Sequence, residues 1–346
     1  MDFSPTEAQR DLSALTRSIL AEHPTWDDLA NAGVLSAALP EDVGGAGFGL
    51  LEQCSVLVEL GRAAAPLPYL SSIVVAASGL ARFGTPEQRE KWVAPAACGQ
   101  VVLTAALAEE LGEEPTTAAE RVPGGWLLTG SKTTVPAGTD ADLFLVPART
   151  SGGPAVFLVE PQEVAITPQR LVDSDDAVGL ELAGVHLGDD RLLPGAEVVD
   201  WLTARATVGL CALQLGVTER ALELTAEYAR TRVQFDRPIG SFQAVAQRLA
   251  DAFIDVAAIR LTLWQAAWRL ASDLPCDAEV ATAKFWAADA GHRVAHTAVH
   301  VHGGTGIDMG NDLHRYFLAA KRNEFELGGA TAQLLRIGAA LAAQPS

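Results

Sequence analysis

The hydrophobic pattern of this 346-residue chain changes its period twice, and this order restricts the possible folds more than any other feature. Up to about residue 100, apolar residues follow helical spacing, as Leu12, Leu15 and Ile19 do. Ser4–Pro5 indicates the start of a helix, and Pro40–Gly47 is predicted to break the helical pattern. From Val101 to about Gly195, short β-rich runs alternate with turns of glycine, proline and aspartate, which is typical of a small all-β domain. Helical spacing then returns. The order favours an α+β protein and excludes a repeated βαβ unit.

We therefore predict three domains. These are an N-terminal helical domain over residues 1–100, a central β domain over 101–197 and a C-terminal helical bundle over 198–346. In the last domain, Asp200–Phe235 and Ser241–Ser272 contain no proline, a third helix is predicted over Ala278–Val299, and a fourth begins near Leu313. Long helices of this kind suit a four-helix bundle.

Composition excludes several classes of partner. The 25 basic and 43 acidic residues give a net charge of −18, which repels the phosphate backbone of nucleic acids. The longest apolar run, Leu70–Leu80, is too short to span a bilayer, and the first residues lack the basic and apolar regions of an export signal. The cysteines are scattered without paired spacing. We expect a cytoplasmic protein with no nucleic-acid partner and no membrane span.

The segment Tyr228–Gln243 carries specific chemistry. Its sequence is YARTRVQFDRPIGSFQ, and a long helix follows it. Arg232 offers a planar guanidinium suited to a pyrophosphate, Gln234 and Gln243 add neutral donors, and Phe235 provides a flat apolar wall. On the residues alone, a helix end rich in solvated arginines is the alternative.

A glycine-rich segment, His300–Gly306, follows the third predicted helix and reads HVHGGTG. Gly303 and Gly304 allow a backbone to approach a ligand closely and supply N–H donors. The segment does not follow a strand, so a Rossmann turn is excluded. A plain helix C-terminal turn after Val299 is the alternative.

Three histidines share one face of the helix before this segment: His292, His296 and His300. No carboxylate in the pattern completes a ligand set for a metal ion. We predict that these histidines are structural and that the chain has no metal site.

Together these segments resemble the motifs of the acyl-CoA dehydrogenase family. Tyr228–Gln243 resembles the family signature, and His300–Gly306 resembles its second C-terminal motif. Pro40–Gly49 resembles its N-terminal loop, and Gly130–Lys132 resembles the β-domain turn before its flavin strand. The resemblance spans nearly the whole chain in the right order. It implies the fold of that family, FAD as the cofactor, and α,β-dehydrogenation of an acyl-CoA thioester.

The resemblance also implies where FAD is contacted. In the family, these motifs hold an FAD that is bound mainly by the neighbouring subunit of a dimer. It assigns diphosphate and adenosine contacts to Arg232, Gln234, Phe235 and Gln243. The adenine–ribose end is assigned to His300 and Gly304, with Gly303 in the same turn. The family usually has Gln at the position of His300.

The positions of the catalytic base carry no carboxylate. In the commonest family pattern a Glu precedes Gly-Thr, and counting from Gly303 places this position at Leu327. A second branch places its base at the position of Ala206. Glu326 is the fallback candidate, although a shift of one residue on a helix rotates a side chain by ~100°.

The flavin pocket also departs from the family pattern. The Trp-x-Thr of the family aligns with Thr134 and Pro136, and its Thr-Glu-Pro strand aligns with Ala108–Glu110. Further acidic residues and a proline follow at Glu113, Glu114 and Pro115. We expect the added carboxylates to repel a CoA phosphate or the electron-rich pyrimidine of a flavin.

These departures favour the shorter, base-less subunit of a two-protein α2β2 acyl-CoA dehydrogenase, similar to those that act on steroid side-chain CoA thioesters. A homologous partner subunit supplies the base in this interpretation, and the acyl-CoA substrate binds in the complex. The resemblance implies an electron-transfer flavoprotein as the electron acceptor. Two alternatives stay open: a self-sufficient dehydrogenase that uses Glu326, and a flavin-free scaffold or regulatory protein with the same fold.

Overall fold

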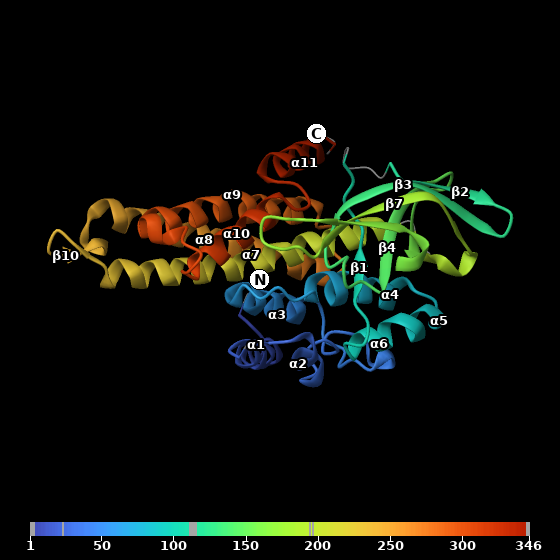
Figure 1. Ribbon diagram of the computed structural model, residues 1–346, viewed down its shortest axis with the longest axis horizontal. Coiled ribbons are helices and arrows are strands. Elements are labelled where there is room, and N and C mark those ends of the chain that lie inside the picture. The colour runs from blue at the N-terminus through green and yellow to red at the C-terminus, as the bar shows by residue number, and fades with distance from the viewer. Residues whose placement is uncertain (1–3, 23, 111–115, 194, 196, 344–346) are drawn as a thin grey trace. The chain divides into compact units, whose positions relative to one another are not determined.

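The computed structural model describes residues 4–22, 24–110, 116–193, 195 and 197–343 (Figure 1). The chain forms two compact units that alternate along the sequence. The bundle unit contains Met1–His23, Leu51–Pro66 and Thr207–Ser346, and the sheet unit contains Pro24–Leu50 and Leu67–Ala206. The order of helices, strands and helices confirms the predicted α+β fold. The domain limits at 100 and 197 stay predictions.

The sheet unit contains an eight-stranded sheet in the order β6-β7-β3-β2-β4-β5-β8, with β1 paired in parallel to β4. The β-rich runs predicted from the sequence lie in β3, β4 and β5. The strands are β1 (Leu103–Ala105), β2 (Ala118–Val122), β3 (Gly125–Val135), β4 (Leu143–Thr150), β5 (Gly153–Val159), β6 (Ala165–Gln169), β7 (Ala177–Leu187) and β8 (Leu192–Leu193).

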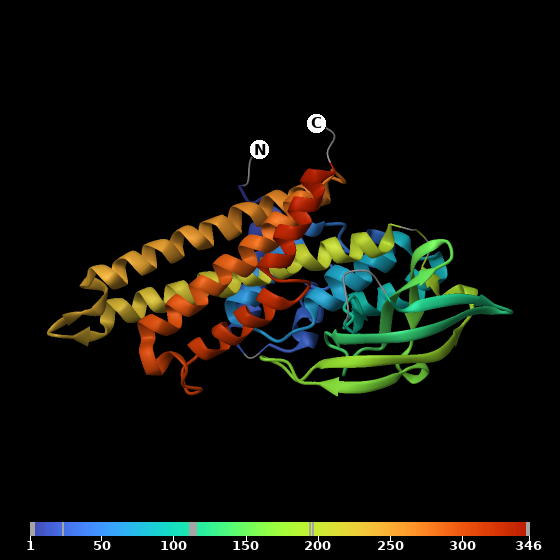
Figure 2. The ribbon, with the colours of Figure 1, turned by 90° about the horizontal axis from the view of Figure 1, so that it is seen from above.

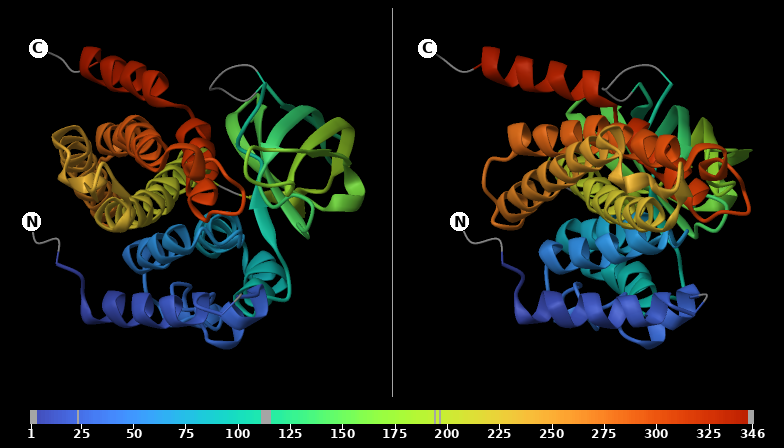
Figure 3. Two further views of the ribbon diagram at one scale, coloured as in Figure 1. Left: turned by 60° about the vertical axis from the view of Figure 1, so that its left-hand side comes forward. Right: turned by 90° about the vertical axis from the view of Figure 1, so that its left-hand side faces the viewer.

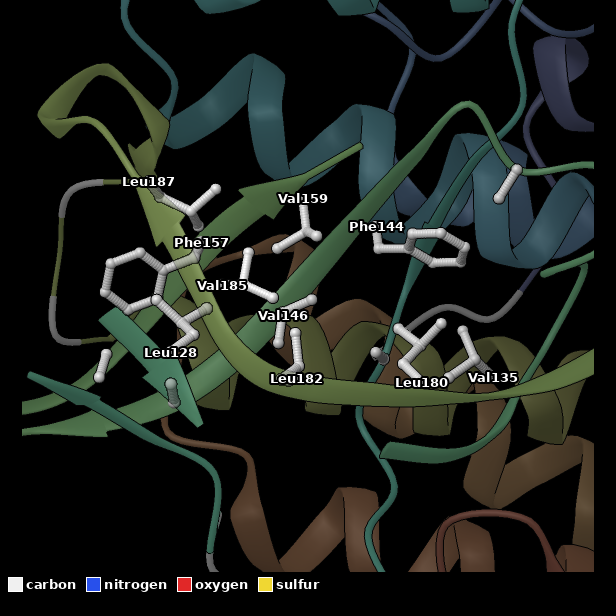
Figure 4. Close-up of a cluster of buried hydrophobic side chains, with 14 of the residues drawn as sticks. Leu128, Val135, Phe144, Val146, Phe157, Val159, Leu180, Leu182, Val185 and Leu187 are labelled. Carbon is white, nitrogen blue, oxygen red and sulfur yellow. The ribbon is translucent and has the colours of Figure 1, made fainter. Parts of the chain in front are cut away.

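The core of the sheet unit follows the two-residue period of its strands. Phe144 and Val146 alternate along β4 and point into one buried cluster with Phe157, Leu128 and Leu182 (Figure 4). Each of these five side chains is fully buried. Burial of large aromatic and branched side chains on one face stabilises the sheet at roughly 25 cal/mol per Å² of apolar surface.

Short helices complete the sheet unit. The predicted break at Pro40–Gly47 is confirmed, because a single 3-10 turn there ends at Gly44 with φ +86°. Gly45 must be glycine, since an added Cβ would lie 1.9 Å from the carbonyl oxygen of Leu39. The helices are α2 (Trp26–Asn31), η1 (Glu41–Val43), η2 (Leu70–Ala77), α4 (Ser78–Phe83), α5 (Pro86–Gln88), η3 (Arg89–Val93) and α6 (Ala94–Ala97).

The helices that lie wholly or mainly in the bundle unit are α1 (Glu7–Leu20), α3 (Leu50–Ala63), α7 (Val198–Thr231), α8 (Gln243–Ala271), α9 (Asp277–His302), α10 (Leu313–Phe325) and α11 (Ala330–Ala342). The predicted set of four C-terminal helices omitted α11. The side chain of Thr6 caps α1. The cap lies two residues after Ser4, where the sequence indicated the start of the helix.

Helix α9 packs against α8, α10 and α11, and Figure 3 shows orange α9 beside gold α8. Its buried face consists largely of alanines, with Gly291 among them. A Cβ at Gly291 would lie 2.0 Å from Nε2 of Gln214 on α7. Small residues therefore allow the close approach of neighbouring helices. Among the described helices, none is both long enough and apolar enough to cross a membrane.

The prediction that a helix continues to Phe235 is wrong. Helix α7 ends at Thr231, and an antiparallel hairpin follows, formed by β9 (Val233–Gln234) and β10 (Arg237–Pro238). Phe235 and Asp236 form its two-residue turn, with φ of +53° and +65°. The absence of proline does not exclude such a turn, because side chains other than glycine can adopt positive φ when the surrounding structure requires it.

Candidate functional site

The hairpin β9–β10 projects from one end of the bundle unit, between α7 and α8 (Figure 2). Arg232 closes its neck: its N–H donates to the carbonyl of Tyr228 at 2.8 Å, and its carbonyl accepts from Ile239 N–H at 2.9 Å. The Arg237 guanidinium lies 4.1 Å from the ring centroid of Phe242, a cation–π contact that holds the far strand. The hairpin backbone is therefore fixed from both sides.

Several side chains assigned to the cofactor by resemblance are exposed on this hairpin and at the first residue of α8. Arg232, Gln234 and Gln243 are exposed, and none of them forms a side-chain hydrogen bond or ion pair with the residues that the structure describes. Phe235 is 86% exposed, although it is a large apolar ring. Donors without partners beside an exposed aromatic ring fit a ligand or a second chain that the hairpin contacts.

The glycine-rich segment presents an open backbone. Helix α9 continues to His302, three residues beyond the predicted end at Val299, and Gly303 caps it with φ +63°. A Cβ added at Gly303 or Gly304 would meet no atom within 4 Å. Gly304 does not have a positive φ, so neither its conformation nor packing within the described chain requires glycine there. Because Gly303 and Gly304 have no side chain and open space beside them, a ligand could contact their backbone closely.

Tyr228 and His302 bring the two motifs together at one end of the bundle. Their rings stack with centroids 4.3 Å apart and an interplanar angle of 20°. His302 is buried, and its Nδ1 lies 2.9 Å from the carbonyl oxygen of Ala298. Burial lowers the pKa of His302. His302 is part of the motif HVHGGTG, but the sequence predicts no role for it, because no nearby residue indicates a contact with Tyr228.

His300 lies on the rim of a groove of about 770 Å³ between α8 and α9, and His292 and His296 also line it. The predicted shared face of the three histidines is therefore confirmed. The fold brings a carboxylate to these histidines that their sequence pattern does not contain. Glu324 on α10 lies 3.1 Å from Nδ1 of His292, and Lys321 lies 3.0 Å from the same atom.

These groups form a charge network. No cluster of three metal-binding side chains occurs in the part of the chain that the structure describes. Burial, the neighbouring His292 and the charge of Lys321 lower the pKa of His296. The network joins α9 to α10 through His292, whose Nδ1 contacts both Glu324 and Lys321, and these two residues also pair with each other within α10.

The two positions predicted for the catalytic base carry apolar residues, one within a helix and one between two helices. Ala206 is buried within α7. Leu327 lies between α10 and α11 with φ +56°, a strained value for leucine. Gln333 donates to the carbonyls of Leu327 and Gly328, each at 3.1 Å. The fallback candidate Glu326 lies 3.4 Å from Arg322 Nε, one turn earlier on α10.

The positions of the family's flavin wall are occupied by contacts within the sheet unit. Thr134 has φ +48°, and its N–H donates to Gln169 Oε1 at 2.6 Å. The carbonyl of Pro136 accepts from Thr104 Oγ1 at 2.7 Å, and proline has no N–H to offer. Thr134 lacks the aromatic ring of the family's Trp, and Pro136 lacks the hydroxyl of the family's Thr.

Glu109 is neutralised within its own chain, whereas the repulsion expected from Glu110 stays a prediction. Glu109 and Lys132 form a buried ion pair, and Thr116 and Thr117 also donate to this carboxylate. Burial raises the pKa of Glu109, but the hydrogen bonds and charge of Lys132 and the bonds from Thr116 lower it to about 2. The carboxylate is thus neutralised by its own chain. Glu113, Glu114 and Pro115 lie outside the described residues.

Comparisons with known proteins agree with this arrangement. The sequence matches the acyl-CoA dehydrogenase N-terminal domain over residues 4–100 and the acyl-CoA dehydrogenase C-terminal domain over residues 194–342. It is 51% identical to acyl-CoA dehydrogenase FadE27 of Mycobacterium tuberculosis, covering 100% of both chains.

Solved structures give the same result. A chain of the ChsE4–ChsE5 complex from Mycobacterium tuberculosis matches with a TM-score of 0.96 and 52% identity, covering 100% of both chains. A chain from a variant of the Tcur3481–Tcur3483 steroid ACAD matches with a TM-score of 0.92 and 38% identity, covering 97% of this chain and 98% of that one. With both family domains and full-length relatives of this similarity, the chain belongs to the acyl-CoA dehydrogenase family, a family of flavoprotein oxidoreductases.

Proposed function

We propose that this chain is the base-less subunit of a heteromeric acyl-CoA dehydrogenase. It contributes FAD contacts across a subunit interface, and a homologous partner supplies the catalytic base. One contrast carries the proposal. Both base positions, Leu327 and Ala206, lack a carboxylate, whereas the hairpin that bears Arg232 keeps its donors free of partners within the described chain.

The similar proteins support a heteromeric enzyme. One matching structure is the ChsE4–ChsE5 complex, and another is a two-component steroid ACAD. We extend both features to this chain: its partner is a second acyl-CoA dehydrogenase chain, and its substrate class is a CoA thioester of a steroid side chain. An electron-transfer flavoprotein is the proposed electron acceptor.

The residues of this chain fit the polar end of FAD. The Arg232 guanidinium binds the diphosphate through charge-assisted hydrogen bonds. Gln234 and Gln243 donate further hydrogen bonds, and the ring of Phe235 shields the adenosine from water. The open backbone at Gly304 allows the adenine–ribose end to approach, with His300 beside it.

The reaction itself requires a base and a hydride acceptor. When bound, FAD supplies the acceptor for the hydride from the β carbon of the thioester. A carboxylate must hold the proton removed from the α carbon, and such positioned proton transfer contributes roughly 10²–10⁴-fold. In the proposal this carboxylate belongs to the partner, and this chain binds and orients the cofactor.

Specific contacts disfavour the two alternatives. A self-sufficient enzyme requires Glu326 to act as base, but its carboxylate is held 3.4 Å from Nε of Arg322, and the pair restrains the side chain. A flavin-free scaffold does not require an exposed Phe235 or an open Gly304.

The test is to purify the chain alone and together with a homologous acyl-CoA dehydrogenase subunit that carries the catalytic base. We expect yellow protein and acyl-CoA-dependent dye reduction only from the joint preparation. A yellow, active isolated chain would show that the chain is self-sufficient. Protein that stays colourless in both preparations, with full solubility, would favour the scaffold.

A further inference from the structure

The contact between Tyr228 and His302 joins the two segments that carry the proposed FAD contacts. We call these contacts the cofactor face, with Arg232 on one side and the Gly303–Gly304 turn on the other. Tyr228 lies in the last turn of α7, and its carbonyl accepts the N–H of Arg232 at 2.8 Å. His302 is the last residue of α9, directly before Gly303. The stacked rings, 4.3 Å apart, therefore connect the arginine side of the face with its glycine side.

Each side is rigidly attached to its ring. The carbonyl of His302 accepts from Thr305 Oγ1 at 2.7 Å, and a Cβ at Gly306 would lie 3.0 Å from Cβ of His302. The glycine turn therefore follows any movement of His302. On the other side, the 2.8 Å bond from Arg232 makes the hairpin follow Tyr228.

The chemistry of His302 is unusual for a purely apolar core position. An imidazole that is 7% exposed loses hydration, which lowers its pKa and favours the neutral ring. Its Nδ1 contacts the carbonyl of Ala298 in its own helix, which fixes the plane of the ring. A flat, oriented ring is suited to stack on tyrosine, and an aliphatic side chain is not.

We infer that Tyr228 and His302 are positioning residues, which hold Arg232 and the Gly303–Gly304 turn in a fixed position relative to each other so that both contact one FAD. The inference rests on the proposed function, because it concerns FAD held by these two sides. Without the stack, each side keeps its own groups but loses its fixed distance from the other. Binding then requires the two sides to be ordered, which weakens affinity.

The experiment uses the flavin-loaded complex of this chain with its partner. The complex is deflavinated and titrated with FAD, and the dissociation constant is measured together with the thermal midpoint. We expect Tyr228→Leu and His302→Leu to weaken FAD binding about tenfold. Tyr228→Phe keeps the stacking ring and is expected to retain wild-type affinity.

A matched control separates positioning from general loss of stability. Leu263 is fully buried in α8 and belongs to neither side of the face. Leu263→Ala is expected to lower the thermal midpoint at least as much as Tyr228→Leu, while FAD affinity changes less than twofold. Equal loss of affinity in the Leu263→Ala complex would overturn the inference.

A double-mutant cycle with Arg232→Ala completes the test. If Tyr228 acts by positioning Arg232, Tyr228→Leu weakens FAD binding in the wild-type background but has little further effect after Arg232→Ala. Fully additive effects, or no effect of Tyr228→Leu, refute the inference and leave the proposed function intact. If Arg232→Ala itself leaves FAD affinity unchanged, the proposed function fails and the positioning role fails with it.

Discussion

The hairpin β9–β10 and strand β3 both carry motifs of a flavin enzyme, but they differ in whether their polar groups have bonding partners within the described chain. On the hairpin, Arg232 and Gln234 have no side-chain partner among the described residues. On β3, Lys132 is paired with Glu109, and the N–H of Thr134 is bonded to Gln169. Polar groups without partners on a rigid hairpin are available to another molecule, whereas polar groups already satisfied are structural. In the proposed function the hairpin therefore serves as a contact surface, and the polar groups of β3 serve the fold of the sheet unit.

The comparison is tested most strongly by breaking the buried pair on β3. Lys132→Met leaves the Glu109 carboxylate buried without its cation, and we expect the free energy of unfolding to fall by about 3–5 kcal/mol. Urea unfolding followed by circular dichroism measures this change. Lys91→Met is the control, since the Lys91–Glu160 pair is largely exposed at its lysine and should contribute less than about 1 kcal/mol. Equal effects of the two substitutions would contradict a structural role for Lys132.

The hairpin should give the reverse result. Arg232→Ala is expected to leave the stability of the chain unchanged and to weaken FAD binding to the complex by about 2–5 kcal/mol. Flavin content after gel filtration and titration of the apo complex measure the effect. Arg230→Ala provides the control, because Arg230 pairs with Glu227 on the exposed surface of α7. A complex that keeps its full flavin content after Arg232→Ala would remove this residue from the site.

The pH dependence of stability tests whether histidines of the bundle unit, like the polar groups of β3, are structural. The folded-state pKa of His302 and of His296 is below the ordinary value of 6.5, so the unfolded chain binds more protons near this pH. Their contribution to stability is complete above pH 6.5 and is lost as the pH falls through the folded-state values. Thermal midpoints between about pH 7.5 and 5 should fall for the wild type and fall less for His302→Phe.

The smallest expected effect concerns the base itself. Leu327→Glu should not produce dehydrogenase activity in the isolated chain, because Thr134 and Pro136 do not rebuild a flavin wall. A carboxylate restored without flavin and thioester has no proton to remove. Acyl-CoA-dependent dye reduction by the variant without its partner is the measurement. Activity clearly above the unmodified chain would mean that the pocket is intact and that only the base was lost.

Features that depend on neighbours in the sequence were predicted well. Hydrophobic spacing identified the α+β order, and turn residues marked the break at Pro40–Gly47. The motif Tyr228–Gln243 identified the family because its chemistry lies within one short segment. The error at Phe235 has a local cause as well: a helix and a two-residue hairpin both tolerate the segment, and the structure selects the hairpin.

Contacts between distant segments could not be read from the sequence. The carboxylate of Glu109 appeared as an added charge until the fold placed it against Lys132. His292 lacked a carboxylate partner until α10 brought Glu324 to it, and His302 had no assigned role until it met Tyr228.

Local patterns of hydrophobicity and turn chemistry determine helices, strands and motifs, because each involves residues only a few positions apart. Which polar groups meet depends on how those elements pack. The sequence by itself therefore determined the family and the order of elements, and the base positions at Leu327 and Ala206 stay predictions from it. Only the tertiary structure decided which charges are neutralised and which remain available to another molecule.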